Sequence, residues 1–210
     1  MNVSGAPKLA ILIPTIEGRE QFFQAIRDEL ERQRRALARP DDVVVLVNKD
    51  DQTKTIGQKR NELMDAAVAS GATHRAFIDD DDMISADYLG ANLPGVDGGF
   101  DCNALVGRHY INGVFDRPFY HSLRFTRWWH DAAGYYRNPN HLNVVKIDLV
   151  KHVRFPARSF GEDGSFSEEI ARQDLLKTEF AISQVVYHYY ARSKPAHEVE
   201  RVSRQGRGAP

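Results

Sequence analysis

Two short apolar runs constrain the fold of this chain more than any other feature. Residues 9–14 read LAILIP and residues 43–47 read VVVLV. Uninterrupted apolar runs of this length are typical of strands buried on both faces of a parallel sheet. The segment between them, residues 19–38, has apolar side chains at helical spacing and stops before Pro40. The three segments together predict a β-α-β unit.

The alternation of strand and helix continues along the chain. Residues 57–70 have a helical apolar face, and Gly71 stands where a helix C-terminus favours glycine. Residues 75–78 then form a third short apolar strand. This order is typical of the nucleotide-binding half of a doubly wound α/β sheet, in which ligands bind at the carboxyl ends of the strands.

The second half of the sequence has a different pattern. Residues 104–112 and 114–120 read as strands, with Asn112 and Gly113 as a hairpin turn. We expect further strands at 141–145 and 182–190, and a helix at 165–177. From residue 192 onward the sequence is polar and basic, which predicts a disordered tail. We therefore expect one α/β domain over residues 1–191.

Composition excludes several classes of protein. The formal net charge of −1 gives no global field that would attract nucleic acid or a membrane surface. Cys102 is the only cysteine, so an intramolecular disulfide and a cysteine-rich metal site are excluded, and a reducing, cytoplasmic location is expected. The first residues lack a signal-peptide pattern, and the apolar runs are too short for a membrane span.

An acidic run, residues 79–82, follows the third strand directly. Four adjacent carboxylates repel one another, and a divalent cation relieves that repulsion. Mg²⁺ and Mn²⁺ prefer oxygen ligands and are often shared with substrate phosphates. Side-chain alternation would place Asp79 and Asp81 on one side, with Asp82 assisting around the turn. The alternative is a solvated turn in which one Asp caps the next helix.

Other polar residues stand at predicted element ends. Lys59 and Arg60 lie in the first turns of a helix, where anions are favoured, although a solvated basic face is the alternative. His141 and Asn143 would share one side of a strand and contact donor sugar or acceptor, or make structural hydrogen bonds. His188 lies in the last strand as a candidate metal ligand, or as an ordinary packed histidine.

Arg, His and Trp are concentrated between residues 121 and 137. Between residues 103 and 158, Lys and Arg clearly outnumber Asp and Glu. Aromatic faces stack on sugars or bases, and arginine pairs with phosphates, so we expect Trp128 and Trp129 to lie on the acceptor side. The alternative is ordinary packing of the two Trp side chains under a charged surface.

Five segments in a fixed order resemble the family 2-like glycosyltransferases of GT-A fold. They are IPTIEGRE after the first strand, VNKDD after the second, GQKRNEL at a helix start, FIDDDDM at the third strand end, and GEDGSFSEEI before a late helix. The resemblance spans about residues 8–190. It implies a single GT-A domain, a Rossmann-like mixed sheet flanked by helices. Residues 8–101 would form the nucleotide-sugar-binding half and residues 102–191 the acceptor and catalytic half.

The resemblance also implies roles for individual residues. The acidic run would contribute Asp79 to the ribose and metal and Asp81 to the metal, Mn²⁺ or Mg²⁺, with His188 as a further ligand. Asp163 would be the general base of an inverting reaction, and its alternative role is a favourable charge at a helix N-terminus. Glu162 would lie near acceptor or sugar. The implied nucleotide-sugar contacts are Pro14, Thr15, Glu17, Asp50 or Asp51, Lys59, Arg60, Asp79 and Asp80.

The sequence therefore predicts a metal-dependent glycosyltransferase that moves a sugar from a nucleotide-sugar donor to an acceptor hydroxyl. The acceptor is a saccharide or another soluble molecule, including a hydroxylated base in DNA. Two alternatives remain at this stage. One is a non-catalytic nucleotide or nucleic-acid binding module on the same fold. The other is a nucleotidyltransferase, although the segment after the first strand has only Gly18 where such enzymes carry a glycine-rich loop.

Overall fold

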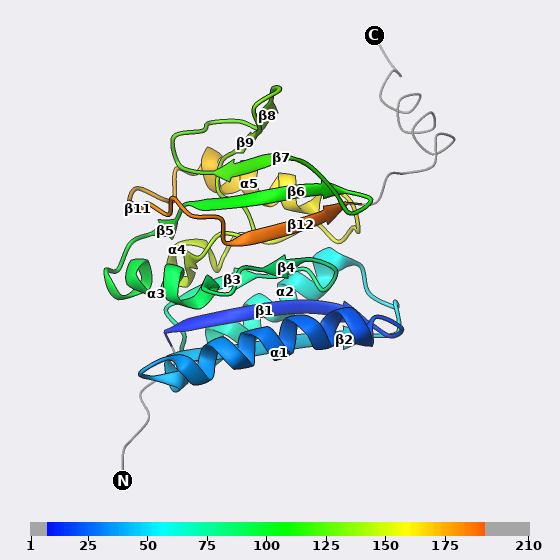
Figure 1. Ribbon diagram of the computed structural model, residues 1–210. Helices are drawn as coiled ribbons and strands as arrows, with labels where there is room; N and C mark the ends of the chain where they lie inside the picture. Colours follow the sequence, from blue (N-terminus) through cyan, green and yellow to red (C-terminus); the bar gives the residue numbers. More distant parts are fainter. Residues whose placement is uncertain (1–7, 192–210) are drawn as a thin grey trace.

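The computed structural model describes residues 8–191, which form a mixed α/β domain built on two mixed sheets (Figure 1). The first sheet lies in the lower half of the view and holds β1 and β2. The second lies in the upper half and holds β6, β7 and β12. The predicted disordered tail, residues 192–210, lies outside the described residues.

The first sheet is organised around β1 (Leu9–Ile16), as the first apolar run predicts. Parallel pairing joins β1 to β2 (Val43–Asp50) on one side and to β3 (His74–Phe77) on the other. Three two-residue strands extend the sheet beyond β3: β10 (Val145–Lys146), β5 (Cys102–Asn103) and β11 (Glu179–Phe180). Because β10 runs antiparallel to both β3 and β5, the sheet is mixed.

One detail of the predicted β-α-β unit is wrong. We expected β2 to be buried on both faces, but β2 is the last strand of its sheet and most of it is only half-buried. Val47 is 43% exposed. The apolar run of β2 reflects β propensity as well as burial, since β-branched residues favour extended backbone at an edge too.

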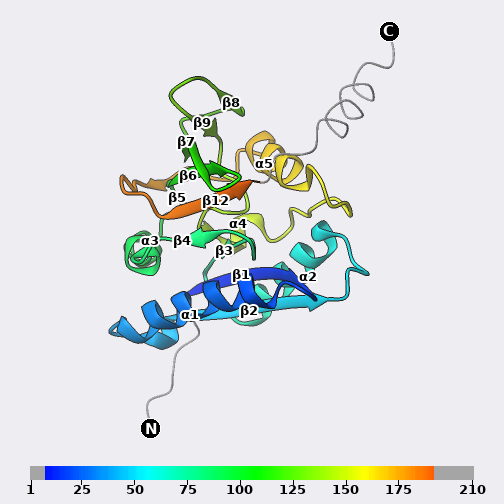
Figure 2. The same cartoon turned by 45° about the vertical axis from the view of Figure 1, so that its right-hand side comes forward.

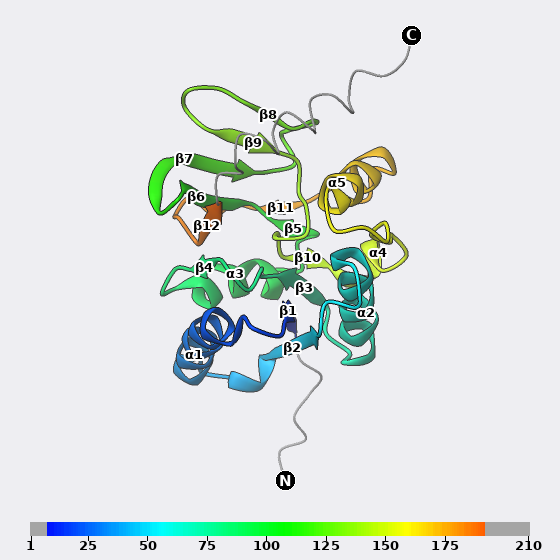
Figure 3. The ribbon, with the colours of Figure 1, turned by 90° about the vertical axis from the view of Figure 1, so that its right-hand side faces the viewer.

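Helices cover both faces of the first sheet (Figure 3). In this view α1 (Glu20–Ala36) and α3 (Tyr88–Asp97) lie on one side, and α2 (Ile56–Ala69), α4 (Ile147–Val150) and α5 (Glu162–Arg172) on the other. The alternating side chains of β1 enter two separate cores. Leu9, Ile11 and Ile13 pack on the α1 side, whereas Ala10 and Leu12 pack on the α2 side.

The second sheet contains β4 (Met83–Ile84), β12 (Tyr187–Ala191), β6 (Leu105–Ile111), β7 (Val114–His121), β9 (Tyr135–Arg137) and β8 (Trp129–His130) in spatial order. The predicted hairpin is confirmed, with Asn112 and Gly113 at φ 52° and 80°. Figure 2 shows β4 and β12 between the two halves of the domain. Because β4 follows the acidic run, this pairing brings β12 to the strand ends of the first sheet.

Several predicted boundaries need correction. Of the expected strand at 141–145, only Val145 lies in a strand, because the Asn140 and Asn143 side chains bind backbone amides of the same loop and hold it in a turn. The late helix runs over Glu162–Arg172 rather than 165–177. The four-residue helix α4 and the 3₁₀ turn η1 (Pro40–Asp42) were not predicted.

Within residues 8–191, no helix has the length and apolar character needed to cross a bilayer.

Gly57 offers a test of the packing between α2 and the segment before α5. A Cβ at Gly57 would overlap the carbonyl oxygen of Pro156, and the Gly57 amide donates to Arg158 O at 3.1 Å. We expect Gly57→Ala to lower the free energy of unfolding by about 1–3 kcal/mol, because overpacking against backbone outweighs the helical preference for alanine. Urea denaturation measures this difference.

Gly164→Ala is the matched control, because it also lies in the first turns of a helix. A Cβ there would meet only the Trp128 ring at 3.9 Å, an ordinary contact. We expect Gly164→Ala to be neutral or stabilising by up to about 1 kcal/mol. Equal effects of the two substitutions would contradict the packing described here.

Candidate functional site

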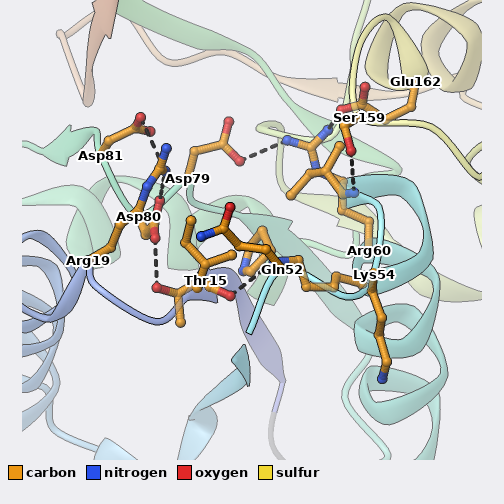
Figure 4. Close-up of a pocket in the computed structure, with 14 residues that line it drawn as sticks. Thr15, Arg19, Gln52, Lys54, Arg60, Asp79, Asp80, Asp81, Ser159 and Glu162 are labelled. Atoms are coloured by element: carbon orange, nitrogen blue, oxygen red, sulfur yellow. Dashed lines mark hydrogen bonds and ion pairs between the residues drawn. The ribbon is translucent and has the colours of Figure 1, made fainter. Parts of the chain in front are cut away.

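A cavity of about 440 Å³ opens at the carboxyl ends of β1 and β3 (Figure 4). Its wall is formed by the end of β1, the loop before α2, the first turns of α2, the acidic run and the start of α5. We call it the site cavity. Its lining residues are Pro14, Thr15, Ile16, Arg19, Gln52, Lys54, Ile56, Lys59, Arg60, Asp79, Asp80, Asp81, Ser159 and Glu162.

The four carboxylates of the acidic run divide into two kinds. Asp80 and Asp82 are buried and bound to protein. Asp80 accepts hydrogen bonds from Thr15 Oγ1 and Arg19 Nη1, both at 2.6 Å. Asp82 accepts from Tyr187 OH and from the backbone amide of Tyr190, both at 2.8 Å. These two carboxylates hold the loop in place.

Asp79 and Asp81 are the more accessible pair, with side chains 22% and 39% exposed. Asp79 and Asp81 line the site cavity together with Asp80, and residues 80–82 form a turn, so the strand does not continue and the predicted alternation does not apply. Burial would raise the pKa of Asp79, but the Arg60 cation outweighs it and holds that pKa well below its ordinary value. Burial raises the pKa of Asp81, which Arg19 opposes.

Arg60 connects the walls of the site cavity. Its guanidinium donates to Glu162 on α5 and, at 2.8 Å, to Asp79 after β3. It also lies 3.0 Å from His141 Nε2. Because burial and the neighbouring Arg60 cation lower the pKa of His141, its imidazole is neutral and can accept this hydrogen bond. Arg60 is thus a buried cation with carboxylate partners on two elements.

Lys59 is also committed to protein partners. Its ammonium group donates to the backbone oxygen of Thr15 at 3.0 Å and to Asp50 at 2.8 Å. The side chain is 4% exposed. Lys59 therefore joins the ends of β1 and β2, and it lines the site cavity without a free charge. Lys59 and Arg60 both line the site cavity as paired cations, and their contact with a diphosphate stays a prediction.

Several predicted nucleotide contacts lie outside the cavity wall. Asp50 faces Lys59 and accepts from the backbone amide of Lys54, whereas Asp51 is exposed. Glu17 is exposed, and its backbone amide donates to Asp50 O at 2.9 Å. Pro14 and Thr15 do line the cavity. The structure thus brings together part of the predicted nucleotide set, and the roles of its members stay predictions.

His188 is not brought to the acidic run. Its ring nitrogens lie 3.1 Å from Ser85 Oγ and 3.3 Å from Tyr110 OH. Alternation along β12 explains this position, because Tyr187 points toward Asp82 and the next residue points to the opposite face of the sheet. The cavity lining does not include His188.

Asn143 likewise serves the fold. Its side chain is fully buried, accepting from the Asn140 amide and lying 3.1 Å from His121 Nδ1, and donating to Asn103 O. Since Asn143 has no surface left for a ligand, the structural alternative holds for it. His141 differs, because its Nε2 lies 3.4 Å from Asp79 Oδ2 and so borders the site.

Glu162 and Asp163 open α5, three residues earlier than expected. Glu162 is buried against Arg60, so it orients that guanidinium and closes one end of the site cavity. Asp163 is half-buried, and its carboxylate favours the charged forms of Arg60, Arg137 and His141 by opposing the burial that lowers their pKa values. It therefore lies on the side of the site formed by β9 and the His141 loop.

The two tryptophans point to different environments. Trp128 donates from Nε1 to Ser167 on α5 at 3.3 Å, and Arg137 covers its ring at 4.3 Å. Trp129 is 42% exposed and stacks on Tyr136 at a centroid distance of 4.0 Å. Trp129 is thus the more exposed of the two and Trp128 is half-buried, and the acceptor role of both stays a prediction.

Four polar lining residues were missed by sequence reasoning: Arg19, Gln52, Lys54 and Ser159. Arg19 contacts Asp80 at 2.6 Å and Asp81 at 3.3 Å. A signal was available, because Gly18 adopts φ 84° and turns the chain directly after the first strand. A basic residue at that turn lies at the same sheet edge as the acidic run.

A divalent cation is compatible with these residues. Among residues 8–191, no three His, Cys, Asp or Glu side chains converge to hold a metal by themselves. A site completed by substrate phosphates and water needs only one or two carboxylates, and Asp79 and Asp81 supply two hard oxygen donors facing one cavity. The donor set fits Mg²⁺ or Mn²⁺ rather than a soft metal.

The fold resembles crystal structures of S. aureus TarS. TarS 1-349 in complex with UDP-GlcNAc gives a TM-score of 0.58 at 13% identity, covering 91% of this chain and 60% of that chain. TarS 1-349 in complex with UDP gives 0.57 at 15% identity, covering 92% and 62%. A longer TarS structure gives 0.58 at 15% identity, covering 93% of this chain and 38% of that chain.

The chain thus spans less than two thirds of the TarS structures it matches. No protein-family model and no curated protein sequence matches it. At identities of 13–15% the likeness establishes the fold, a mixed α/β domain of GT-A type, and the predicted fold class is confirmed.

Because Asp82 is bound to protein and Asp81 is accessible, we expect their alanine substitutions to change the free energy of unfolding by different amounts. Asp82→Ala would leave the Tyr187 hydroxyl and the Tyr190 amide without their acceptor. We expect a loss of about 1–3 kcal/mol in the free energy of unfolding for each group left unsatisfied. Asp81→Ala, at an accessible position, should change it by about 0.5 kcal/mol or less. Urea denaturation of both variants checks this, and equal losses would refute the division.

Proposed function

We propose that this chain is a glycosyltransferase that transfers a sugar from a nucleotide-sugar donor to an acceptor hydroxyl. The observation that carries the proposal is the site cavity, where Asp79 and Asp81 open to a ligand at the carboxyl ends of β1 and β3. TarS, which shares the fold, has been crystallised with UDP-GlcNAc. Ligands of open α/β sheets bind at this edge, which supports a nucleotide-sugar donor here.

Asp79 and Asp81 would hold a divalent cation, Mn²⁺ or Mg²⁺, together with the donor diphosphate. The charges of the cavity lining support this assignment, because four cations, Arg19, Lys54, Lys59 and Arg60, are matched by Asp79, Asp80, Asp81 and Glu162. A diphosphate would add negative charge that these balanced side chains do not offset. A bound divalent cation supplies that charge and stabilises the departing nucleoside diphosphate.

Asp163 is the proposed general base. Its carboxylate takes the proton of the acceptor hydroxyl as the hydroxyl oxygen bonds to the anomeric carbon. The bond between that carbon and the diphosphate oxygen breaks, and the nucleoside diphosphate leaves with the electron pair. Attack from the face opposite the leaving group inverts the configuration. Arg60, oriented by Glu162, lies on the diphosphate side of the site, where Glu162 and Asp79 balance its charge.

The metal assignment predicts that nucleoside diphosphate binding depends on Mn²⁺ or Mg²⁺. Calorimetry with UDP, GDP, dTDP and CDP, in the presence of Mn²⁺ or a chelator, measures this dependence. In Asp81→Ala the metal-dependent part of the affinity should fall by at least about tenfold, because one of two protein ligands is lost.

Asp41→Ala is the matched control, since Asp41 is exposed at the opposite end of β2 and should leave affinity unchanged. Equal affinity with and without chelator in the wild-type protein would remove the metal from the mechanism.

The substitution Asp163→Asn distinguishes two roles of Asp163: a general base, and a charge that only stabilises the N-terminus of α5. The amide has nearly the same shape but does not take a proton at neutral pH, so transfer should fall by about 10²–10⁴-fold while donor affinity is retained. Removing a charge from the first turn of α5 alone should change the free energy of unfolding by only about 0.3–1 kcal/mol. Turnover measured as released nucleoside diphosphate, with acceptor present, gives the answer.

Glu168→Gln removes an exposed charge from the same helix and should leave turnover unchanged. If Asp163→Asn turns over at the wild-type rate, Asp163 is a helix charge and the base must be sought elsewhere.

A further inference from the structure

One cation beside the site lacks the carboxylate partner that its neighbours have. Arg19, Lys59 and Arg60 each pair with Asp or Glu. The side chain of Arg137, in β9, forms no hydrogen bond and no ion pair with residues 8–191. Arg137 is half-buried, and its nitrogens are not among the fully buried atoms that lack a partner, so solvent reaches them.

Trp128 fixes the position of Arg137. The guanidinium carbon lies 4.3 Å from the centre of the Trp128 ring, a cation–π contact. The indole is in turn anchored on α5, donating to Ser167 at 3.3 Å and lying next to Gly164. An arginine held in this way loses little further freedom when it binds an anion. Trp128 therefore acts on a ligand through Arg137 and not by stacking.

The surroundings of Arg137 place it on the Asp163 side of the site. Burial lowers the pKa of Arg137, and Asp163 and Tyr189 oppose that shift. Tyr189 in turn lies close enough to Asp79, Asp81 and Asp82 for their charges to raise its pKa. The Trp128 ring that Arg137 covers lies next to Gly164, so Arg137 lies near the start of α5, where Asp163 is. It does not line the cavity proposed for the donor.

Within residues 8–191 no carboxylate pairs with Arg137, so its guanidinium is open to an anion of a ligand. The donor diphosphate is assigned to the site cavity, so the remaining source is the acceptor. The planar fork of a guanidinium matches a phosphate group in two parallel hydrogen bonds. Arg124 and Arg127, in the loop before β8, also lack ion pairs within the described part of the chain and are exposed.

We propose that Arg137, braced by Trp128, binds a phosphodiester group of the acceptor and brings the neighbouring hydroxyl to Asp163. This inference rests on the proposed glycosyltransferase function and narrows its acceptor to phosphodiester-linked hydroxyl compounds. A nucleotide in a strand and a polyol phosphate both offer this chemistry. The neutral saccharide considered from the sequence would leave Arg137 unpaired.

The test compares matched acceptors with and without phosphodiesters. One pair is a trinucleotide with a central 5-hydroxymethylpyrimidine and the corresponding neutral nucleoside. The other is a glycerol phosphodiester dimer and glycerol. In the wild-type protein, kcat/KM for the better phosphodiester acceptor should exceed that of its neutral partner by about 10- to 100-fold. The arm that shows the preference identifies the source of the phosphate.

Arg137→Gln should abolish this preference while kcat/KM for the neutral acceptor, donor affinity and slow donor hydrolysis by water stay unchanged. Arg137→Lys should restore part of it, since the charge returns without the fork. Arg108→Gln is the control, because Arg108 lies on the opposite face of the second sheet, over Phe115 at 5.9 Å. A merely structural Arg137 would lower transfer to both members of a pair equally, and that result would overturn the proposal.

Calorimetry with the same compounds keeps the two hypotheses separate. If no donor is bound or hydrolysed, the glycosyltransferase function fails, but phosphodiester binding by Arg137 can still be measured. Binding of a phosphodiester compound that weakens at least about tenfold in Arg137→Gln supports the proposal. Equal binding by wild type and Arg137→Gln, or no phosphodiester binding by either, overturns it.

Discussion

The buried guanidinium of Arg60 is the interaction on which the geometry of the site depends. It joins α2 to Asp79 after β3 and to Glu162 on α5, and it lies against the Phe77 and Phe155 rings. Removing a charge from water costs several kcal/mol, which only well-placed partners offset. Because those partners belong to two elements distant in sequence, Arg60 is stable only when both are in place. The site walls are therefore positioned together.

A second polar contact joins the two sheets at the acidic run. Tyr187 on β12 donates to Asp82 and accepts from the backbone amide of Asp79 at 3.2 Å. Burial, together with the nearby carboxylates, raises the pKa of this hydroxyl well above its ordinary value, so it remains a donor at neutral pH. Alternate carboxylates thus fix the loop, and the others remain available to a ligand.

Local signals in the sequence predict the elements well. The apolar run of β1, the Asn112-Gly113 turn and the helix over α2 depend on neighbouring residues, and all three are present in the structure. They also place Pro14, Thr15, Lys59, Arg60 and the acidic run at one sheet edge, because the carboxyl ends of parallel strands meet there.

Local sequence signals do not predict which residues the polar side chains contact. Arg60 and Glu162 are 102 residues apart, and Asp82 and Tyr187 are 105 apart. Periodicity assigns a side chain to a face but does not say what it meets there. For this reason the sequence suggests Lys59 as a diphosphate contact and His188 as a metal ligand. In the structure Lys59 pairs with Asp50, and His188 points away from the acidic run. The turn at Asn140 has the same cause, since its side chain competes with the backbone pairing that a strand pattern implies.

The two sides of the site differ in how their cations are paired, which suggests that they bind different ligands. Around the site cavity every cation near the acidic run is already paired, so that side is close to neutral and favours a ligand that brings its own cation. On the Asp163 side the opposite holds, because among residues 8–191 no carboxylate pairs with Arg137, which packs on an aromatic ring instead. The Trp128 ring is neutral, so its cation–π contact offsets part of the cost of burying the guanidinium without neutralising its charge. Arg137 therefore still attracts an anion. Paired guanidinium groups build the walls of this site, whereas the guanidinium of Arg137 remains available to an anion.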